Sequence, residues 1–205
     1  MKSLISKQEL EELKEKYKGE ERGLPFKSEA LYILDREGEE GLRKLETAMA
    51  DVGYKVDYRE IKFTHFYPIM YEALTLVFIK RIFDYKEEDF FEIGEFALKI
   101  PSVIRTLLNI QRYLLRSPKN LLDRVASKIW KQYFMIGDLQ IVEYDRDSHI
   151  VMRMVDYLHH PLQCAVIRGG LTSLFRLLIG KEKVVCKEQK CVHRGDEYHE
   201  YLIEW

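Results

Sequence analysis

The residue types best suited to metal chemistry gather in the last quarter of the chain. All three cysteines lie there, Cys164, Cys186 and Cys191, together with Glu188 and His199. Thiolate, imidazole and carboxylate are the donor groups that zinc prefers. A tight turn between Cys191 and His199 would pair them across a hairpin, whereas Glu188 needs a bulge to reach the same face. The spacing alone leaves two interpretations open: a metal site, or buried cysteines that act as small hydrophobic residues beside a strand histidine.

The residues around this region supply a further thiol and spare ligands. Cys164 is expected in the first turn of a helix that opens at Pro161, where the helix dipole favours thiolate. His159 and His160 precede this proline and are fallback candidates for a fourth metal ligand. His65 stands before an aromatic helix and could bind heme, but no second heme signal accompanies it, so a core or capping histidine is favoured.

Other catalytic signatures are absent from the sequence. It contains no Gly-x-Gly-x-x-Gly, no Gly-x-x-x-x-Gly-Lys-Ser/Thr, no His-Glu-x-x-His and no Gly-x-Ser-x-Gly. The carboxylates are scattered over amphipathic segments, so no acid/base pair stands out. Gly169-Gly170 falls inside a helical pattern, which favours close helix packing over phosphate binding. We therefore expect a protein that is not an enzyme.

Composition excludes several function classes. The chain has 205 residues and a net charge of −1 from 33 basic and 34 acidic side chains, so no bulk attraction to nucleic acid or to an acidic membrane is expected. With 46% hydrophobic residues it is too apolar for disorder, and its apolar runs are too short to span a membrane. No secretory signal is visible at the start. An odd number of cysteines fits a reduced compartment, so we predict a cytoplasmic protein.

The first half of the chain is expected to be helical. Residues 8–18 predict a short N-terminal helix, and residues 19–23 predict a flexible joint to a single domain over residues 24–205. Further helices are predicted over residues 40–52, over residues 64–83 with Pro68 in the first turn, over residues 90–115 with a break at Pro101, and after Ser117-Pro118.

The second half predicts a hairpin, a long helix and another hairpin. Residues 139–144 and 150–155 alternate around a turn-rich tetrad, and residues 183–193 and 197–205 form the second pair. A helix from His160-Pro161 to Gly180 joins the two hairpins. The prediction is an α+β fold, with an antiparallel sheet of about four strands and helices packed on one face.

Residues 137–205 carry a family resemblance. The run Pro161-x-x-Cys164, Gly170-Leu171-Thr172-Ser173, Gly180, Glu188-x-x-Cys191-x-x-x-Gly195-Asp196-x-x-His199-x-Tyr-x-Ile203 resembles the 4-vinyl-reductase-type domain. That family is related to Bet3-type tethering subunits and to the sensory half of bacterial activators that respond to aromatic effectors. The resemblance implies a structural zinc on Cys164, Glu188, Cys191 and His199, with histidine in place of the last cysteine of the sensors.

Aromatic residues on the predicted helices have two interpretations. A layer of aromatic rings over a sheet is ordinarily plain core. In the sensors that the sequence resembles, the same helices enclose the effector, which implies a pocket for a small apolar or aromatic ligand. The candidate lining residues are Tyr67, Tyr71, Phe78, Trp130, Tyr133 and Phe134.

The resemblance favours a non-catalytic, cytoplasmic module that senses a small apolar or aromatic molecule, contains zinc, forms a homodimer and signals through a separate partner. One alternative is a dimeric protein-interaction scaffold without a ligand, like the tethering subunits. Another is an accessory protein or reductive enzyme of tetrapyrrole metabolism, which only the family name suggests.

Overall fold

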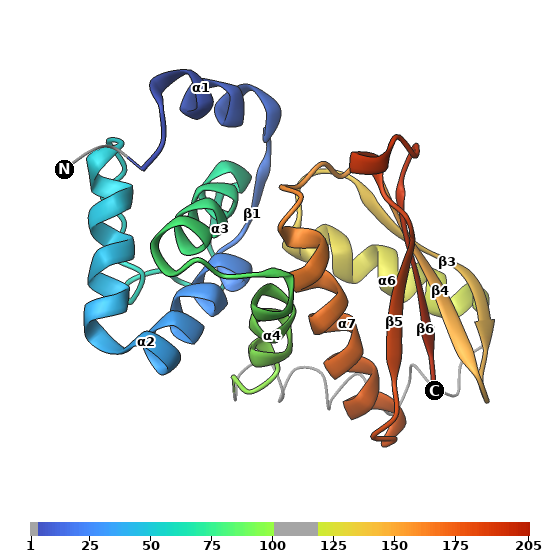
Figure 1. The fold of residues 1–205 in the computed structure, drawn as a ribbon. Coiled ribbons are helices and arrows are strands. Elements are labelled where there is room, and N and C mark those ends of the chain that lie inside the picture. Colours follow the sequence, from blue (N-terminus) through green and yellow to red (C-terminus); the bar gives the residue numbers. More distant parts are fainter. Residues whose placement is uncertain (1–3, 101–118) are drawn as a thin grey trace.

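A computed structural model describes residues 4–100 and 119–205 (Figure 1). The N-terminal part is helical, the C-terminal part is built on a sheet, and the two lie side by side. The helical half contains α1 (Lys7–Lys16), β1 (Glu20–Arg22), α2 (Leu24–Asp51), β2 (Phe66–Pro68), α3 (Ile69–Phe83) and α4 (Glu87–Ala97). The sheet half contains α6 (Lys119–Tyr133), β3 (Asp138–Asp145), β4 (His149–Val155), α7 (Gln163–Ile179), β5 (Val185–Lys190), a 3-10 turn (Val192–Arg194) and β6 (His199–Glu204).

The larger sheet has four antiparallel strands in the order β3-β4-β6-β5. The two outer strands each contain a register shift, in β3 between Ile141 and Glu143 and in β5 between Glu188 and Lys190. Helix α7 packs against β5 and β6, and α6 packs against β3. These elements confirm the predicted α+β class, because both hairpins and the long helix between them are present.

Two helix boundaries differ from the prediction. The helix predicted over residues 64–83 begins only at Ile69, since Phe66–Pro68 pairs with Glu20–Arg22 as a two-stranded sheet. The helix predicted over residues 40–52 is part of the longer α2, which is interrupted at Gly38. Gly38 has a φ of 69°, a conformation that glycine adopts without steric cost.

Close contact between α4 and α7 joins the two halves. A Cβ on Gly94 would lie 1.9 Å from the carbonyl oxygen of Val166, and a Cβ on Gly169 would lie 1.9 Å from that of Phe91. At Gly170 the nearest atom would be 3.7 Å away, an ordinary contact. The predicted packing role of this glycine pair therefore holds for Gly169, where only glycine lets the two backbones approach so closely.

The N-terminal segment is packed onto the helical half. Leu13 and Tyr17 are buried, and Arg81 of α3 pairs with Glu9. Residues 20–22, predicted as part of a flexible joint, form β1 instead. Whether the chain folds without residues 1–23 stays a prediction, because burial in the whole chain does not test independent folding.

The remaining sequence predictions concern two helix boundaries, membrane spans and the cellular location. The helix break at Pro101 and the helix start at Ser117-Pro118 lie outside the described residues. Within the described ranges, the helices are all too short or too polar to cross a membrane. The cytoplasmic location stays a prediction.

Candidate functional site

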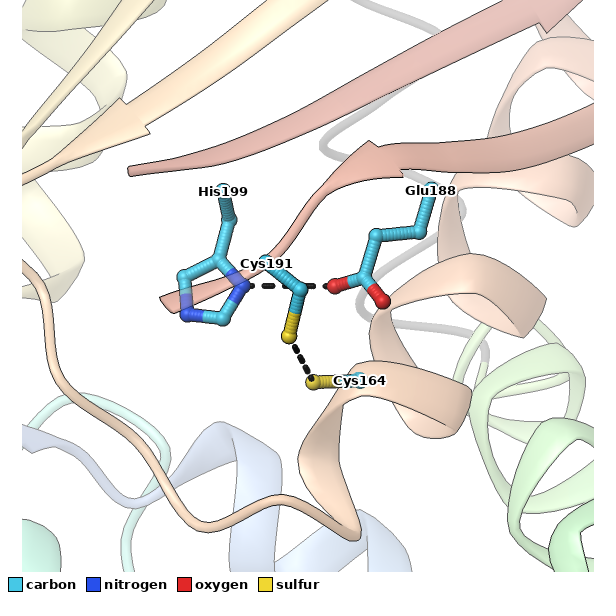
Figure 2. A group of neighbouring side chains, drawn as sticks. All are labelled: Cys164, Glu188, Cys191 and His199. Carbon is cyan, nitrogen blue, oxygen red and sulfur yellow. Dashed lines mark hydrogen bonds and ion pairs between the residues drawn. The ribbon is translucent and has the colours of Figure 1, made fainter. Parts of the chain in front are cut away.

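Four side chains from three segments converge at one end of the sheet (Figure 2). Cys164 comes from the first turn of α7, Glu188 from β5, Cys191 from the residue after β5, and His199 from the start of β6. One sulfur, nitrogen or oxygen atom of each lies within 4.8 Å of those of the other three. We call these four residues the cysteine–histidine cluster.

The register of β5 explains how the second hairpin assembles its three donors. Lys190 pairs with Glu200, so Cys191 follows β5 where His199 begins β6. The register shift between Glu188 and Lys190 inserts one extra residue and turns the glutamate side chain toward the same face. This is the bulge that the odd spacing between Glu188 and Cys191 requires.

Glu188 is held by three neighbouring side chains. Its Oε1 lies 3.2 Å from His199 Nδ1 and accepts a hydrogen bond from the Tyr201 hydroxyl at 3.2 Å, and its Oε2 accepts one from Arg194 at 3.0 Å. Burial alone would raise the pKa of this carboxyl, but the hydrogen bond to His199 and the charge of Arg194 outweigh it and lower the pKa to about 2. Glu188 is therefore a carboxylate at neutral pH and is able to accept a cation.

The two thiols lie together, with Cys164 Sγ 3.8 Å from Cys191 Sγ. Burial raises the pKa of Cys164, and the adjacent Glu188 and Cys191 raise it further. Desolvation beside a carboxylate therefore opposes the thiolate that the helix dipole is expected to favour at Cys164. A bound cation would reverse this balance by supplying the missing positive charge.

Further imidazoles surround the cluster. The ring centroid of His199 lies 4.2 Å from that of His159 and 5.5 Å from that of His193, and His159 Nε2 lies 3.5 Å from Cys164 Sγ. His159, one of the fallback ligands, is fully buried, and burial together with the two histidines lowers its pKa well below the usual range. One ring nitrogen in each of His159, His193 and His199 is buried without a hydrogen-bond partner.

Cys186 does not belong to the cluster. It is a buried residue of β5 whose Cα pairs with that of Ile203 in β6. Its thiol belongs to the hydrophobic core cluster. The structure thus separates the three cysteines into one core residue and two potential ligands.

The six aromatic residues predicted to line a ligand pocket lie on both sides of β1. Tyr67 and Tyr71 pack edge-on against Phe26 in the helical half, where Phe78 is also buried. In the sheet half, Trp130 stacks on Phe134, and both contact the Tyr157 ring. The strand between these groups is held at Glu21, which pairs with Tyr67 on one side and bridges to Phe134 on the other. The remaining residue, Tyr133, lies against the guanidinium of Arg22.

Sequence reasoning missed a second polar cluster beneath these aromatic rings. Glu21, Glu29 and Glu72 are each at most 2% exposed, although they come from β1, α2 and α3. Burial is the largest cause that raises the pKa of all three, and it brings that of Glu72 to about 8. The available signal was Glu72, which stands alone among apolar residues on every side of α3.

Comparison with solved structures identifies similar folds. An H-NOX protein from S. oneidensis in the Fe(II)NO state has a TM-score of 0.62 at 13% identity, over 89% of this chain and 98% of that one. An oxygen-binding H-NOX domain related to soluble guanylate cyclases has a TM-score of 0.55 at 13% identity, over 86% and 89% of the two chains. At this identity the likeness shows the fold alone.

The phenol-responsive sensory domain of the transcription activator PoxR also matches. It has 13% identity over 58% of this chain and 63% of that one, with a TM-score of 0.42, which is too low to carry an argument. No family model matches the chain, and no curated protein matches it either. The 4-vinyl-reductase-type resemblance is therefore not shown by these comparisons.

The comparison overturns zinc as the expected cofactor. Solved proteins that share the fold over nearly their whole length include H-NOX domains, described with Fe(II) and with heme, a cofactor other than zinc. The resemblance that implied zinc is limited to residues 137–205, whereas the fold likeness to H-NOX proteins covers both halves of the chain.

The described residues of this chain, 4–100 and 119–205, do not fit heme. A heme requires a wide apolar cavity with an axial histidine, cysteine or tyrosine. In the described part of the chain, a hollow of about 730 Å³ is lined mainly by polar and charged residues of α6 and β3. His65 is exposed and four of the six histidines gather around Cys164, while residues 101–118 contain no histidine. The junction of the two halves holds three buried carboxyl groups that would oppose a porphyrin.

Proposed function

We propose that this chain is a non-catalytic regulatory module that binds a small molecule and uses a metal ion to fasten α7 to the second hairpin. The observation that carries the proposal is the convergence of Cys164, Glu188, Cys191 and His199 within 4.8 Å. Two sulfurs, one nitrogen and one oxygen complete a four-coordinate sphere, which leaves no open position for catalysis. The likeness of fold to H-NOX proteins, described with bound NO and oxygen, supports a sensory role.

The metal ion would act by linking segments that are distant in the sequence. Cys164 is 24 residues before Glu188, and the other two donors follow the bulge in β5. Such donors converge only in the folded state, so the free energy of metal binding adds to the free energy of folding. Loss of the ion would release the first turn of α7 from the hairpin and leave buried donors unpaired.

Cobalt(II) is a direct probe of this site, because thiolate ligands give Co²⁺ intense charge-transfer absorption and tetrahedral geometry gives strong visible bands. We expect the chain to bind one Co²⁺ with both signatures, and Cys191→Ser to lose most of the thiolate band. Cys186→Ser is the matched control and retains the full spectrum. Stoichiometric binding without thiolate absorption, or an equal loss in both variants, would contradict the assignment.

The small molecule is proposed to bind where the two halves meet, beside the aromatic residues that flank β1. Rings of Tyr67, Trp130 and Phe134 on either side of one short strand support a ligand with an aromatic or apolar part. Native mass spectrometry of protein purified without chelator tests this proposal. A bound small molecule supports sensing, whereas an empty homodimer supports the scaffold alternative.

A sensing module also needs an output. We propose that the chain forms a homodimer and that ligand binding is transmitted to a separate protein, as predicted from the sequence. The packed N-terminal segment is one candidate surface, since Glu9 and Arg81 connect α1 to α3. Sedimentation of the protein with and without its bound small molecule measures whether ligand changes the assembly.

A further inference from the structure

A buried polar junction joins the helical half to the sheet half. Glu21 of β1, Glu29 of α2 and Glu72 of α3 meet Gln163 of α7 and Tyr157 of the segment after β4. The Tyr157 hydroxyl donates to Glu21 Oε2 at 3.3 Å, and Gln163 Nε2 donates to Glu72 Oε1 at 2.6 Å. We infer that this junction binds the ammonium or guanidinium group of a small organic cation.

The unpartnered atoms of the junction are all acceptors. Both carboxyl oxygens of Glu29 and Gln163 Oε1 are buried without a hydrogen-bond partner, whereas Glu21 and Glu72 share a side-chain hydrogen bond. The amide oxygen of Gln163 is not part of an acidic group, yet its side chain is buried against Glu72. Unpaired buried acceptors are costly, and the group that would satisfy these three must carry several N–H donors.

Among residues 4–100 and 119–205, no side chain donates to Glu29 or to Gln163 Oε1. The ion pairs found among the described residues involve none of the three carboxyl groups. Arg22 follows Glu21 directly, but its guanidinium lies over the rings of Phe66 and Tyr133 instead. A cation from solution is therefore the group whose charge and hydrogen-bonding pattern complement the junction.

The junction favours an organic cation over a bare metal ion. The donor atoms of the cysteine–histidine cluster lie within 4.8 Å of one another, whereas those of Glu21, Glu29 and Glu72 do not meet this limit as a set. A larger cation with directional N–H groups bridges such spacing. The ring of Tyr157, packed against Trp130 and Phe134, adds an aromatic wall of the kind that stabilises ammonium groups.

This inference rests on the proposed function, since it specifies the ligand that the sensing module takes. The test uses benzylammonium as the probe and benzyl alcohol, which has the same ring and no charge, as its neutral match. Isothermal titration calorimetry of the full chain measures both. We expect benzylammonium to bind with one site per chain and at least 10-fold more tightly than benzyl alcohol.

Two variants locate the binding. Glu29→Gln and Tyr157→Phe are expected to weaken benzylammonium at least 10-fold and about 3-fold respectively, because a charged acceptor contributes more than one hydroxyl. Glu88→Gln changes an exposed glutamate of α4 and leaves the affinity unchanged. Circular dichroism confirms the fold of each variant, and Tyr157→Phe keeps the test informative if Glu29→Gln does not fold.

Each other outcome overturns the inference in a recognisable way. If benzyl alcohol binds as tightly and Glu29→Gln has no effect, the module senses an uncharged molecule and only the cationic specificity is wrong. If neither compound binds and Glu29→Gln is more stable than the parent, the carboxyl groups are simply protonated. Failure of the proposed function is separate, because the cobalt spectrum and native mass spectrometry test it without benzylammonium.

Discussion

The two buried polar clusters lie on either side of the same turn of α7, yet they are built from opposite chemistry. Gln163 belongs to the glutamate junction and Cys164, the next residue, belongs to the cysteine–histidine cluster. The cysteine–histidine cluster contains soft and borderline donors within 4.8 Å of one another, whereas the glutamate junction contains hard oxygen acceptors from three elements. If both proposals hold, the donor set of each cluster determines its ligand: a metal ion at the cysteine–histidine cluster and an organic cation at the glutamate junction.

The connection between β4 and α7 joins these clusters a second time. Tyr157 contacts Glu21, and His159 lies against Cys164. The Tyr157 and His159 rings stack on each other, with their centroids 5.4 Å apart. A movement of this segment would therefore disturb both clusters together. That arrangement provides a physical route by which occupation of one could alter the other.

Separating α7 from α4 should disturb both clusters at once, so we expect it to cause the largest loss of stability. In Gly169→Ala the new methyl carbon would lie 1.9 Å from the Phe91 carbonyl oxygen, so the helices must move apart. We expect a loss of about 3 kcal/mol or more in the free energy of unfolding, measured by urea denaturation. Gly170→Ala is the control, since its nearest contact is 3.7 Å, and an equal loss there would contradict the packing argument.

The pH dependence of stability should distinguish the glutamate junction from the cysteine–histidine cluster. The pKa of Glu72 is raised from 4.5 to about 8 by burial, so the folded protein favours its protonated form. Its contribution is complete below about pH 4.5 and is lost as the pH rises through about 8. For one carboxyl group this amounts to about 1.4 kcal/mol per pH unit.

Thermal unfolding of the parent and of Glu72→Gln across this range measures the effect. The variant should show a flatter profile, because a neutral amide has no proton to lose. Saturating benzylammonium should also flatten the parent profile, since a bound cation stabilises the carboxylate. Because buried His159 and His160 have lowered pKa values and contribute the opposite trend, the comparison with the variant decides: identical pH profiles for the parent and Glu72→Gln would refute the protonated junction.

Removal of one ligand should affect only the cysteine–histidine cluster. We expect Cys191→Ser to weaken Co²⁺ binding by more than about 100-fold, because loss of a direct ligand exceeds the 10- to 100-fold effect typical of residues behind the ligands. Competition with a chromogenic chelator measures the affinity. The profile of stability against pH in metal-free protein should match that of the parent, and a changed profile would show that the clusters are not separate.

The smallest effect is expected from the single hydroxyl that links the junction to the sheet half. Tyr157→Phe keeps the ring contacts with Trp130 and Phe134 and removes only the hydrogen bond to Glu21. The free energy of unfolding should fall by about 1 kcal/mol in chemical denaturation. A loss several times larger would mean that Tyr157 has a role in the junction beyond this hydrogen bond.

Local patterns in the sequence determined the sheet half. Alternation gave the two hairpins, Gly180 with a φ of 71° ends α7 as expected, and the odd spacing of Glu188 and Cys191 required the bulge that β5 contains. The spacing of Cys164, Glu188, Cys191 and His199, joined to a family resemblance, was enough to nominate residues that the fold brings together. These features depend on neighbours along the chain or on one hairpin register, so they are readable without the tertiary structure.

Only the tertiary structure revealed the junction, and only the fold comparison removed zinc as the expected cofactor. Glu21, Glu29 and Glu72 have no mutual spacing that a sequence pattern could detect, since packing of β1, α2 and α3 brings them together. Residues 20–22 likewise look like a charged joint until their pairing with residues 66–68 is known. Local propensity decides which segments become helices or strands, whereas burial of a charge depends on which distant segments pack around it.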